Sequence, residues 1–101
     1  MQSMDNLKKL GNLEKAGNNA WQAFQDFNSA VMAEGAISVK NKELIALAVA
    51  LTTQCGYCLE LHRQAAEKAG ASQEEIAETI MIAGALRAGA ALTHGTQLLS
   101  D

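Results

Sequence analysis

Apolar residues recur along this chain at intervals of three and four, the spacing that places side chains on one face of a helix. Gly17 closes the first such segment, and Asn18 or Asn19 is expected to cap the next one. The apolar positions of these two segments are Leu7, Leu10, Leu13, Ala20, Trp21, Ala23, Phe24, Phe27, Ala30 and Val31. The pattern predicts two amphipathic helices, the second ending near Glu34 and Gly35.

A longer apolar stretch, residues 44–51, predicts a third helix in the middle of the chain. Ser38 is expected to cap its start, because a serine hydroxyl accepts a hydrogen bond from a free backbone N–H of the first turn. Glu43 lies in the first turns of this helix. The helix leads into the sequence Cys-Gly-Tyr-Cys at residues 55–58, where Gly56 is expected to allow a break or bend.

The remaining segments also carry residues that typically begin and end helices. A fourth helix is expected to stop at Gly70, a typical residue just past a helix end. Ser72 and Glu75 form the pattern of a capping box, which predicts the start of a fifth helix ending near Gly89. A final helical segment is expected within residues 90–99. The pattern predicts an all-α fold, a compact domain of five to six helices that takes in the whole chain of 101 residues.

The composition agrees with a helical protein and excludes several other classes. The chain is 49% hydrophobic and 19% charged, and it contains no proline. The hydrophobic content is too high for a disordered chain, and a net charge of −3 argues against nucleic acid as a partner. For this size, folding is expected to leave about 5,500 Å² of surface exposed out of about 15,500 Å². The core that this leaves is modest, so association with other subunits would add to the stability of the fold.

The sequence also indicates where in the cell the protein is located. The longest unbroken apolar run, Ile45 to Leu51, is too short to span a bilayer. Residues 1–5 lack a basic segment followed by an apolar one, so we expect no signal peptide, no membrane partner and a cytoplasmic location.

Small residues within 83–91 indicate close helix packing, either inside the chain or at a subunit interface, and both interpretations remain open.

The two cysteines stand three residues apart and a histidine follows them. On a helix, Cys55, Cys58 and His62 share one face. A thiolate is the nucleophilic form of cysteine, and a helix N-terminus and a nearby imidazole both favour it. A second cysteine can then condense with the sulfenic acid that a peroxide leaves on the first. This arrangement predicts a thiol pair that reduces peroxides.

Other uses of a CxxC sequence fit less well. A c-type haem requires histidine directly after the second cysteine, where this chain has Leu59. A thioredoxin fold requires a strand before the motif and normally a cis-proline facing it, and the chain has no proline. A zinc site made by Cys55, Cys58 and His62, with Glu43 as fourth ligand, remains open, as does a purely structural cysteine pair.

The spacing of Glu43, Cys55, Cys58 and His62 resembles the signature of the AhpD-like alkylhydroperoxidases, within the carboxymuconolactone decarboxylase superfamily. The flanking sequence agrees in three stretches: residues 42–50, 69–72 and 75–78. The resemblance covers roughly residues 35–95. It implies an all-α, AhpD-like domain with the CxxC at the N-terminal end of a central helix, assembled as a homo-oligomer, commonly a trimer or a hexamer.

The resemblance also implies roles for individual residues. Cys58 matches the peroxidatic cysteine, Cys55 the resolving cysteine, and His62 with Glu43 a proton relay. The implied enzyme reduces alkyl hydroperoxides with electrons from an external dithiol, such as a lipoylated protein, and holds no bound cofactor or metal. Some members carry a second histidine where this chain has Tyr57, which can form hydrogen bonds but is a poor base near neutral pH. Tyr57 is therefore expected to act as an auxiliary residue at most.

Two other functions remain open as alternatives to a peroxidase. The first is a redox-switch or zinc-binding module without turnover. The second is a decarboxylase acting on a small carboxylated lactone, although the members of that branch lack the cysteine pair. Glu43 also has a simpler interpretation, as a carboxylate that interacts with the positive end of a helix.

The sequence also predicts where several residues outside the motif lie in the fold. The aromatic residues expected to pack in the core or at an interface are Trp21, Phe24 and Phe27. Met32 and Met81 are expected to fill the core, Lys40 and Lys42 to lie on solvated faces, and His94 to lie at the surface or an interface.

Overall fold

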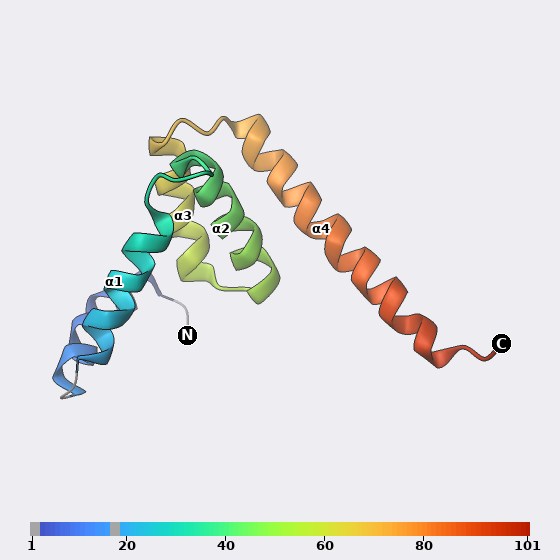
Figure 1. The fold of residues 1–101 in the computed structure, drawn as a ribbon, viewed down its shortest axis with the longest axis horizontal. Coiled ribbons are helices and arrows are strands. Elements are labelled where there is room, and N and C mark those ends of the chain that lie inside the picture. Colours follow the sequence, from blue (N-terminus) through green and yellow to red (C-terminus); the bar gives the residue numbers. More distant parts are fainter. Residues whose placement is uncertain (1–2, 17–18) are drawn as a thin grey trace.

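The computed structural model describes residues 3–16 and 19–101, and these residues form helices and connecting turns without any strand. The elements are η1 (Met4–Ala16), α1 (Ala20–Met32), α2 (Val39–Thr53), α3 (Gly56–Lys68), α4 (Gln73–Gly95) and η2 (Thr96–Leu98), shown in Figure 1. The predicted all-α class is thereby confirmed. The roles predicted for Gly17 and Asn18 lie outside the described residues. Asn19 precedes α1, but its side chain makes no capping hydrogen bond.

Local signals account for most of the helix boundaries. The Ser38 hydroxyl accepts a hydrogen bond from the Asn41 backbone N–H at 3.1 Å and so caps α2, as predicted. Gly70 follows the C-cap of α3 with a φ of 100°, a left-handed conformation that glycine adopts without steric cost. The Ser72–Glu75 capping box opens α4, with both of its hydrogen bonds present. These three predictions are confirmed.

The break between α2 and α3 does not lie at Gly56. Gln54 ends α2 in the left-handed region, with a φ of 58°, and its N–H bonds to the Ala50 carbonyl. Cys55 is then the N-cap of α3, and Gly56 is simply the first residue of that helix. The expectation was wrong because glycine looked like the residue best suited to a bend, whereas an ordinary C-cap at Gln54 makes the turn.

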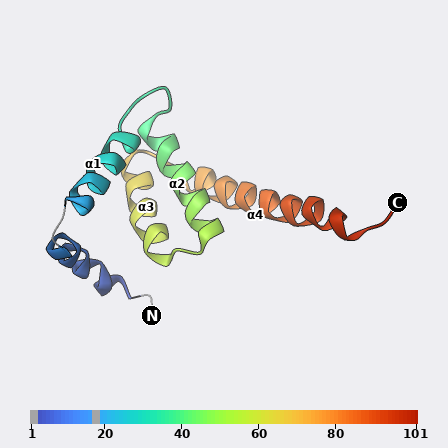
Figure 2. The same cartoon turned by 60° about the horizontal axis from the view of Figure 1, so that its bottom comes forward.

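The core lies where α3 and the first half of α4 pack against α2 (Figure 2). Its buried apolar residues are Leu47, Ala50, Ala66 and Ala83, joined by the buried polar residues Glu43 and Thr79. The radius of gyration is 17.1 Å, against about 13 Å for a compact chain of this length. The second half of α4 extends away from the other helices in both views, which gives the chain an elongated shape.

The structure differs from the predicted end of the chain. The fifth helix and the final helical segment are one continuous α4, since Gly89 keeps helical conformation and the helix ends only at Gly95. Met81 is 72% exposed, so its predicted place in the core is wrong. Phe24 and Phe27 are exposed on α1, so they do not pack in the core of the single chain, and the alternative of an interface stays a prediction.

Lys40 and Lys42, which were expected on solvated faces, also connect helices. The Lys42 ammonium donates to the carbonyls of Val31, at 2.7 Å, and Ala33, at 2.5 Å. It therefore satisfies carbonyl groups that lack an intrahelical partner at the end of α1. Lys40 bridges from α2 to Glu75 in the first turn of α4 at 2.9 Å. These contacts were not predicted, because sequence spacing does not show which carbonyls or carboxylates a lysine can reach.

The capping box at the start of α4 leads to a prediction about stability. We expect Ser72→Ala to lower the free energy of unfolding by about 1 kcal/mol, whereas Ser72→Thr keeps the hydroxyl acceptor and most of that stability. Urea denaturation followed by circular dichroism measures both. A Ser72→Ala protein as stable as the wild type would contradict the importance of the cap.

The same box has a pH dependence with a defined sign. The Lys40 ammonium, and then the Ser72 backbone N–H, hold the pKa of Glu75 below its usual value. A lowered pKa in the folded state means that the stabilisation is present above the carboxyl's ordinary pKa and is lost as the pH falls through the lowered one. We therefore expect the destabilisation caused by Glu75→Gln, measured by urea denaturation, to be present near neutral pH and to shrink in acid.

Candidate functional site

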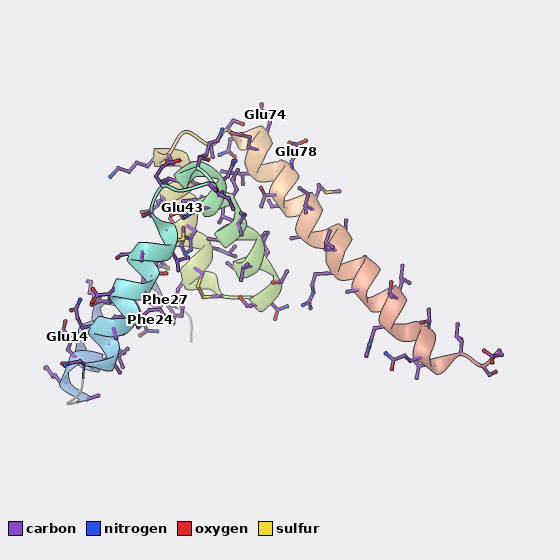
Figure 3. The ribbon with its side chains drawn as sticks, in the orientation of Figure 1. Glu14, Phe24, Phe27, Glu43, Glu74 and Glu78 are labelled. Atoms are coloured by element: carbon purple, nitrogen blue, oxygen red, sulfur yellow. A yellow bond between two sulfur atoms is a disulfide. The ribbon has the colours of Figure 1, made fainter. Side chains whose placement is uncertain are left out.

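The two cysteines lie at the turn that joins α2 to α3. Figure 3 labels Glu43, the candidate site residue that lies on α2. The cysteines form a disulfide, with their Cα atoms 5.3 Å apart. Cys55 is the N-cap of α3, and its sulfur accepts a hydrogen bond from the Cys58 backbone N–H at 3.3 Å. Both residues are half-buried. A sulfur at this position lies at the positive end of the helix, which stabilises negative charge.

The structure refines the predicted common face of Cys55, Cys58 and His62. Cys58 and His62 are both inside α3, one turn apart, as a spacing of four requires. Cys55 stands just before the first turn and reaches Cys58 through the disulfide. The predicted position of the CxxC at the start of a helix is confirmed.

Glu43 and His62 come together from two helices. Oε2 of Glu43, on α2, lies 2.5 Å from Nδ1 of His62, on α3, although 19 residues separate them in the sequence. Glu43 is only 8% exposed, whereas His62 is half-buried. A buried carboxylate is costly without a hydrogen-bonding partner, and the imidazole supplies one. The resemblance implies that these two residues form one relay; the structure shows their contact, and the relay itself stays a prediction.

The contact defines which nitrogen of the histidine is available for chemistry. When Nδ1 donates its proton to the Glu43 carboxylate, Nε2 of His62 holds the lone pair and can accept a proton. The simpler interpretation of Glu43, as a carboxylate of a first helical turn, is not supported, since the first turn of α2 contains no acidic residue. Glu43 is therefore placed to orient His62.

The N-terminal segment also reaches the site. The Asn6 side-chain amide, in η1, donates a hydrogen bond to the Tyr57 hydroxyl at 3.0 Å. Tyr57 lies between the two cysteines and is half-buried. Sequence reasoning missed Asn6, and no local signal could have found it, because 51 residues separate the two partners.

The zinc alternative depends on the state of the sulfur atoms. Zinc binds cysteine as the thiolate, and in the oxidised form each sulfur is bonded to the other. In the part of the chain that the structure describes, no three His, Cys, Asp or Glu residues are grouped so that they could hold a metal ion. The cysteine pair would have to be reduced before it could serve as a ligand set.

A small apolar cavity adjoins α3. It has a volume of about 230 Å³ and lies between α2, α3 and α4; it is lined by Leu47, Leu51, Leu59, Arg63, Ile76, Thr79 and Ile80. Leu59 directly follows Cys58 in the sequence. The chain thus holds an apolar space beside the helix that carries the redox pair.

An all-helical domain with a disulfide at a helix start and a Glu–His pair one turn further on defines a class, and comparison with known sequences agrees. The sequence model of the carboxymuconolactone decarboxylase family matches residues 19–101, and the chain belongs to this family.

The chain is also similar to individual proteins. The chain is 42% identical over 91 residues to "Uncharacterized protein 4 in cox locus" of Paracoccus denitrificans, covering 90% of this chain and 82% of the relative. An uncharacterized protein of Cupriavidus necator is 33% identical over 75 residues, or 74% of this chain and 66% of the relative. One from Haemophilus influenzae is 42% identical over 59 residues, or 58% and 52%. None of these names states an activity.

Proposed function

We propose that this chain is a thiol-dependent peroxidase that reduces alkyl hydroperoxides through Cys58 and Cys55. The observation that supports this most directly is the disulfide at the N-cap of α3, with the Glu43–His62 pair one helical turn away. A close disulfide at the positive end of a helix, beside an oriented imidazole, is the arrangement that thiol redox chemistry requires. Family membership is consistent with this chemistry.

The oxidative half of the proposed reaction begins from the dithiol. The Cys58 thiolate attacks one peroxide oxygen; a sulfur–oxygen bond forms, the oxygen–oxygen bond breaks, and the alcohol leaves with a proton. Cys58 is then a sulfenic acid. The Cys55 thiol attacks that sulfur, water leaves, and the disulfide seen in the structure is formed. One peroxide is reduced by two electrons, and two thiols are oxidised.

The reductive half requires an external dithiol, such as a lipoylated protein. A thiolate of the donor attacks Cys55 and forms a mixed disulfide, and its second thiol then releases the reduced protein. Cys55 is the candidate for this attack because it lies at the N-cap, outside the helical turns. No bound cofactor is needed in this scheme.

The Glu43–His62 pair is proposed to accept and return the proton of the Cys58 thiol. Nε2 of His62 takes the proton of the Cys58 thiol, directly or through water, and later returns a proton to the departing alkoxide. Glu43 holds the ring in the required tautomer through its contact with Nδ1. The apolar cavity beside Leu59 is a suitable place for the alkyl part of the peroxide.

The test is consumption of an organic hydroperoxide by the full chain with dihydrolipoamide as the electron donor. We expect catalytic turnover, with one dithiol oxidised for each peroxide reduced. Redox cycling of the cysteines without turnover, or stoichiometric zinc in the reduced protein, would favour the switch or zinc module instead. Turnover of a carboxylated lactone that survives loss of both cysteines would favour the decarboxylase.

A further inference from the structure

Helix α4 carries little charge after its first two turns, and what it carries is positive. Between Glu78 and Asp101 the sequence has no acidic residue, and the residues that can bear a positive charge are Arg87 and His94. The part of α2 that leads to the cysteines, residues 44–54, has no charged residue either. This end of the molecule is therefore locally electropositive, although the chain has a net charge of −3.

Arg87 differs from Arg63, the other arginine of the chain. Arg63 forms ion pairs with Glu60, at 2.5 Å, and with Glu67, at 2.8 Å. Arg87 takes part in none of the ion pairs that the described residues form, and its guanidinium donates to the Thr52 carbonyl at 3.4 Å. A guanidinium has five N–H donors in a planar fork that matches a carboxylate. Most of the donors of Arg87 are therefore available to an anion.

His94 offers a second donor on the same face of α4, two helical turns after Arg87. Its Nδ1 lies 2.9 Å from the Gln97 side-chain amide nitrogen. Because an amide nitrogen donates, Nδ1 accepts, and Nε2 carries the hydrogen of the neutral ring. An exposed hollow of about 320 Å³ is lined by Arg87, Ala90, Ala91 and His94. Two N–H donors thus flank a space that small side chains leave open.

Arg87 also borders an apolar cleft between α2 and α4. This cleft has a volume of about 210 Å³ and is lined by Leu51, Thr52, Ile80, Ala83, Gly84 and Arg87. Gly84 helps to keep it open, since a Cβ atom at that position would meet nothing within 4 Å. One guanidinium therefore joins an apolar cleft to a hollow that carries donors. This arrangement suits a small molecule with an anionic head and an apolar tail.

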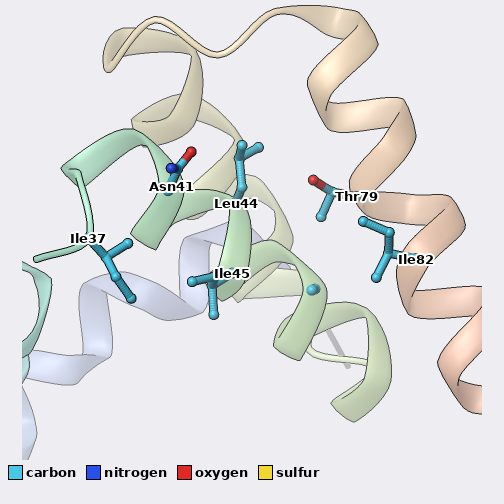
Figure 4. Close-up of a pocket in the computed structure, with 7 residues that line it drawn as sticks. Ile37, Asn41, Leu44, Ile45, Thr79 and Ile82 are labelled. Atoms are coloured by element: carbon cyan, nitrogen blue, oxygen red, sulfur yellow. The ribbon is translucent and has the colours of Figure 1, made fainter.

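The other apolar spaces of the molecule lack such an anchor. The groove in Figure 4 has a volume of about 390 Å³ and is lined by Ile37, Asn41, Leu44, Ile45, Ala48, Thr79 and Ile82. Asn41 and Thr79 can form hydrogen bonds, but none of these described lining residues carries a charge. The cavity beside Leu59 includes Arg63, whose charge two carboxylates already compensate. Of the three spaces, the cleft at Arg87 is the one with an uncompensated charge.

A lipid bilayer is the alternative surrounding for this helix. By length and composition alone, the stretch Gln73–Leu98 qualifies as a membrane span in the part of the chain that the structure describes. Searching for an unbroken apolar run in the sequence had missed it. Arg87 lies in the middle of the apolar part, and an arginine at the centre of a bilayer is strongly unfavourable. A soluble anion suits Arg87 better than a lipid interior does.

We propose that Arg87 and His94 bind the carboxylate of a medium-chain fatty acid, whose alkyl chain lies in the cleft beside Gly84. Charge-assisted hydrogen bonds from the two side chains hold the head, and the tail covers apolar surface of Ile80, which is 51% exposed. Ile80 and Arg87 stand about 10 Å apart along the helix axis, comparable with an extended chain of about eight carbons. This inference rests on charge and shape, and not on the proposed reaction.

The first test is a titration of the full chain, labelled with ¹⁵N, with octanoate, followed by NMR. We expect saturable shifts at the amides of Gly84, Arg87 and His94. Octanol lacks the charge and acetate lacks the tail, so each should bind at least about tenfold more weakly than octanoate. Absence of saturable shifts, or equal binding of octanol, would overturn the proposal. So would flotation with phosphatidylglycerol vesicles without octanoate binding, which would assign Arg87 to a lipid surface.

The two arginines provide a matched pair of variants for the head. We expect Arg87→Gln to lower the affinity for octanoate at least tenfold and to leave the weak binding of octanol unchanged, whereas Arg63→Gln changes neither. Glutamine and arginine have nearly the same helix propensity, so both helices should survive, and circular dichroism can verify this. Unchanged affinity in Arg87→Gln, or a loss in Arg63→Gln alone, would contradict the assigned anchor.

Two glycines of α4 provide the matched pair for the tail. A Cβ atom at Gly84 or at Gly89 meets nothing within 4 Å, so a leucine fits at either position, and it favours the helix. Gly84→Leu fills the cleft and should weaken octanoate binding at least tenfold without changing the response to acetate. Gly89→Leu lies outside the cleft lining and should bind octanoate as the wild type does. Wild-type affinity in Gly84→Leu would overturn the placement of the tail.

Discussion

Replacing Cys58 with serine is expected to abolish hydroperoxide reduction, lowering the rate by at least about a thousandfold, as loss of a catalytic nucleophile does in other enzymes. Serine has no thiolate and so cannot attack the oxygen–oxygen bond near neutral pH. Cys55→Ser should behave differently: it should consume one equivalent of peroxide and stop, with a sulfenic acid on Cys58. Peroxide consumption, together with dimedone labelling and mass spectrometry, distinguishes the two variants.

The structure makes Cys55→Ser a well-matched control. Cys55 is the N-cap of α3, and its sulfur accepts the Cys58 N–H. Serine is among the best residues at that position, so the helix start should survive the substitution, and circular dichroism can verify it. A sulfenic acid that forms in Cys58→Ser and not in Cys55→Ser would reverse the proposed roles. Peroxide reduction that survives both substitutions would end the thiol mechanism.

Removing the His62 imidazole should slow alkylation of Cys58 by about tenfold at neutral pH, because a thiol with the ordinary pKa of about 8.5 is only a few per cent thiolate there and the base raises that fraction. The measurement is the rate of iodoacetamide modification of His62→Ala in a Cys55→Ser background, where Cys58 is the remaining thiol. At strongly alkaline pH the thiol ionises without a base, and the two rates should converge. That convergence separates loss of the base from loss of access.

Glu43→Gln provides the matched test of the orienting carboxylate. Glutamine keeps the size of a side chain that is 8% exposed, and its carbonyl can still accept from Nδ1 of His62. We expect a smaller decrease in rate than for His62→Ala, because the tautomer is retained while the negative charge is lost. Equal alkylation rates in all three proteins would remove the relay from the mechanism.

Much of the helical architecture follows from local chemistry. Ser38, Gly70 and the Ser72–Glu75 box each satisfy backbone groups within a few residues of themselves, so their effect on helix boundaries can be read from the sequence. The wrong predictions of helix boundaries concern Gly56 and Gly89, where a glycine indicated a break and the helix in fact begins or continues. Glycine permits a bend, but packing and caps decide whether one forms.

The sequence by itself determined the helical class, the position of the CxxC at a helix start, and the one-turn spacing from Cys58 to His62, because backbone hydrogen bonding and the helical period act over a few residues. Only the tertiary structure decided that Glu43 meets His62, that Asn6 reaches Tyr57, and that Met81 on α4 lies outside the core. Those outcomes depend on how separate helices pack against one another. A helical period shows which side chains share a face, but not which other helix that face meets.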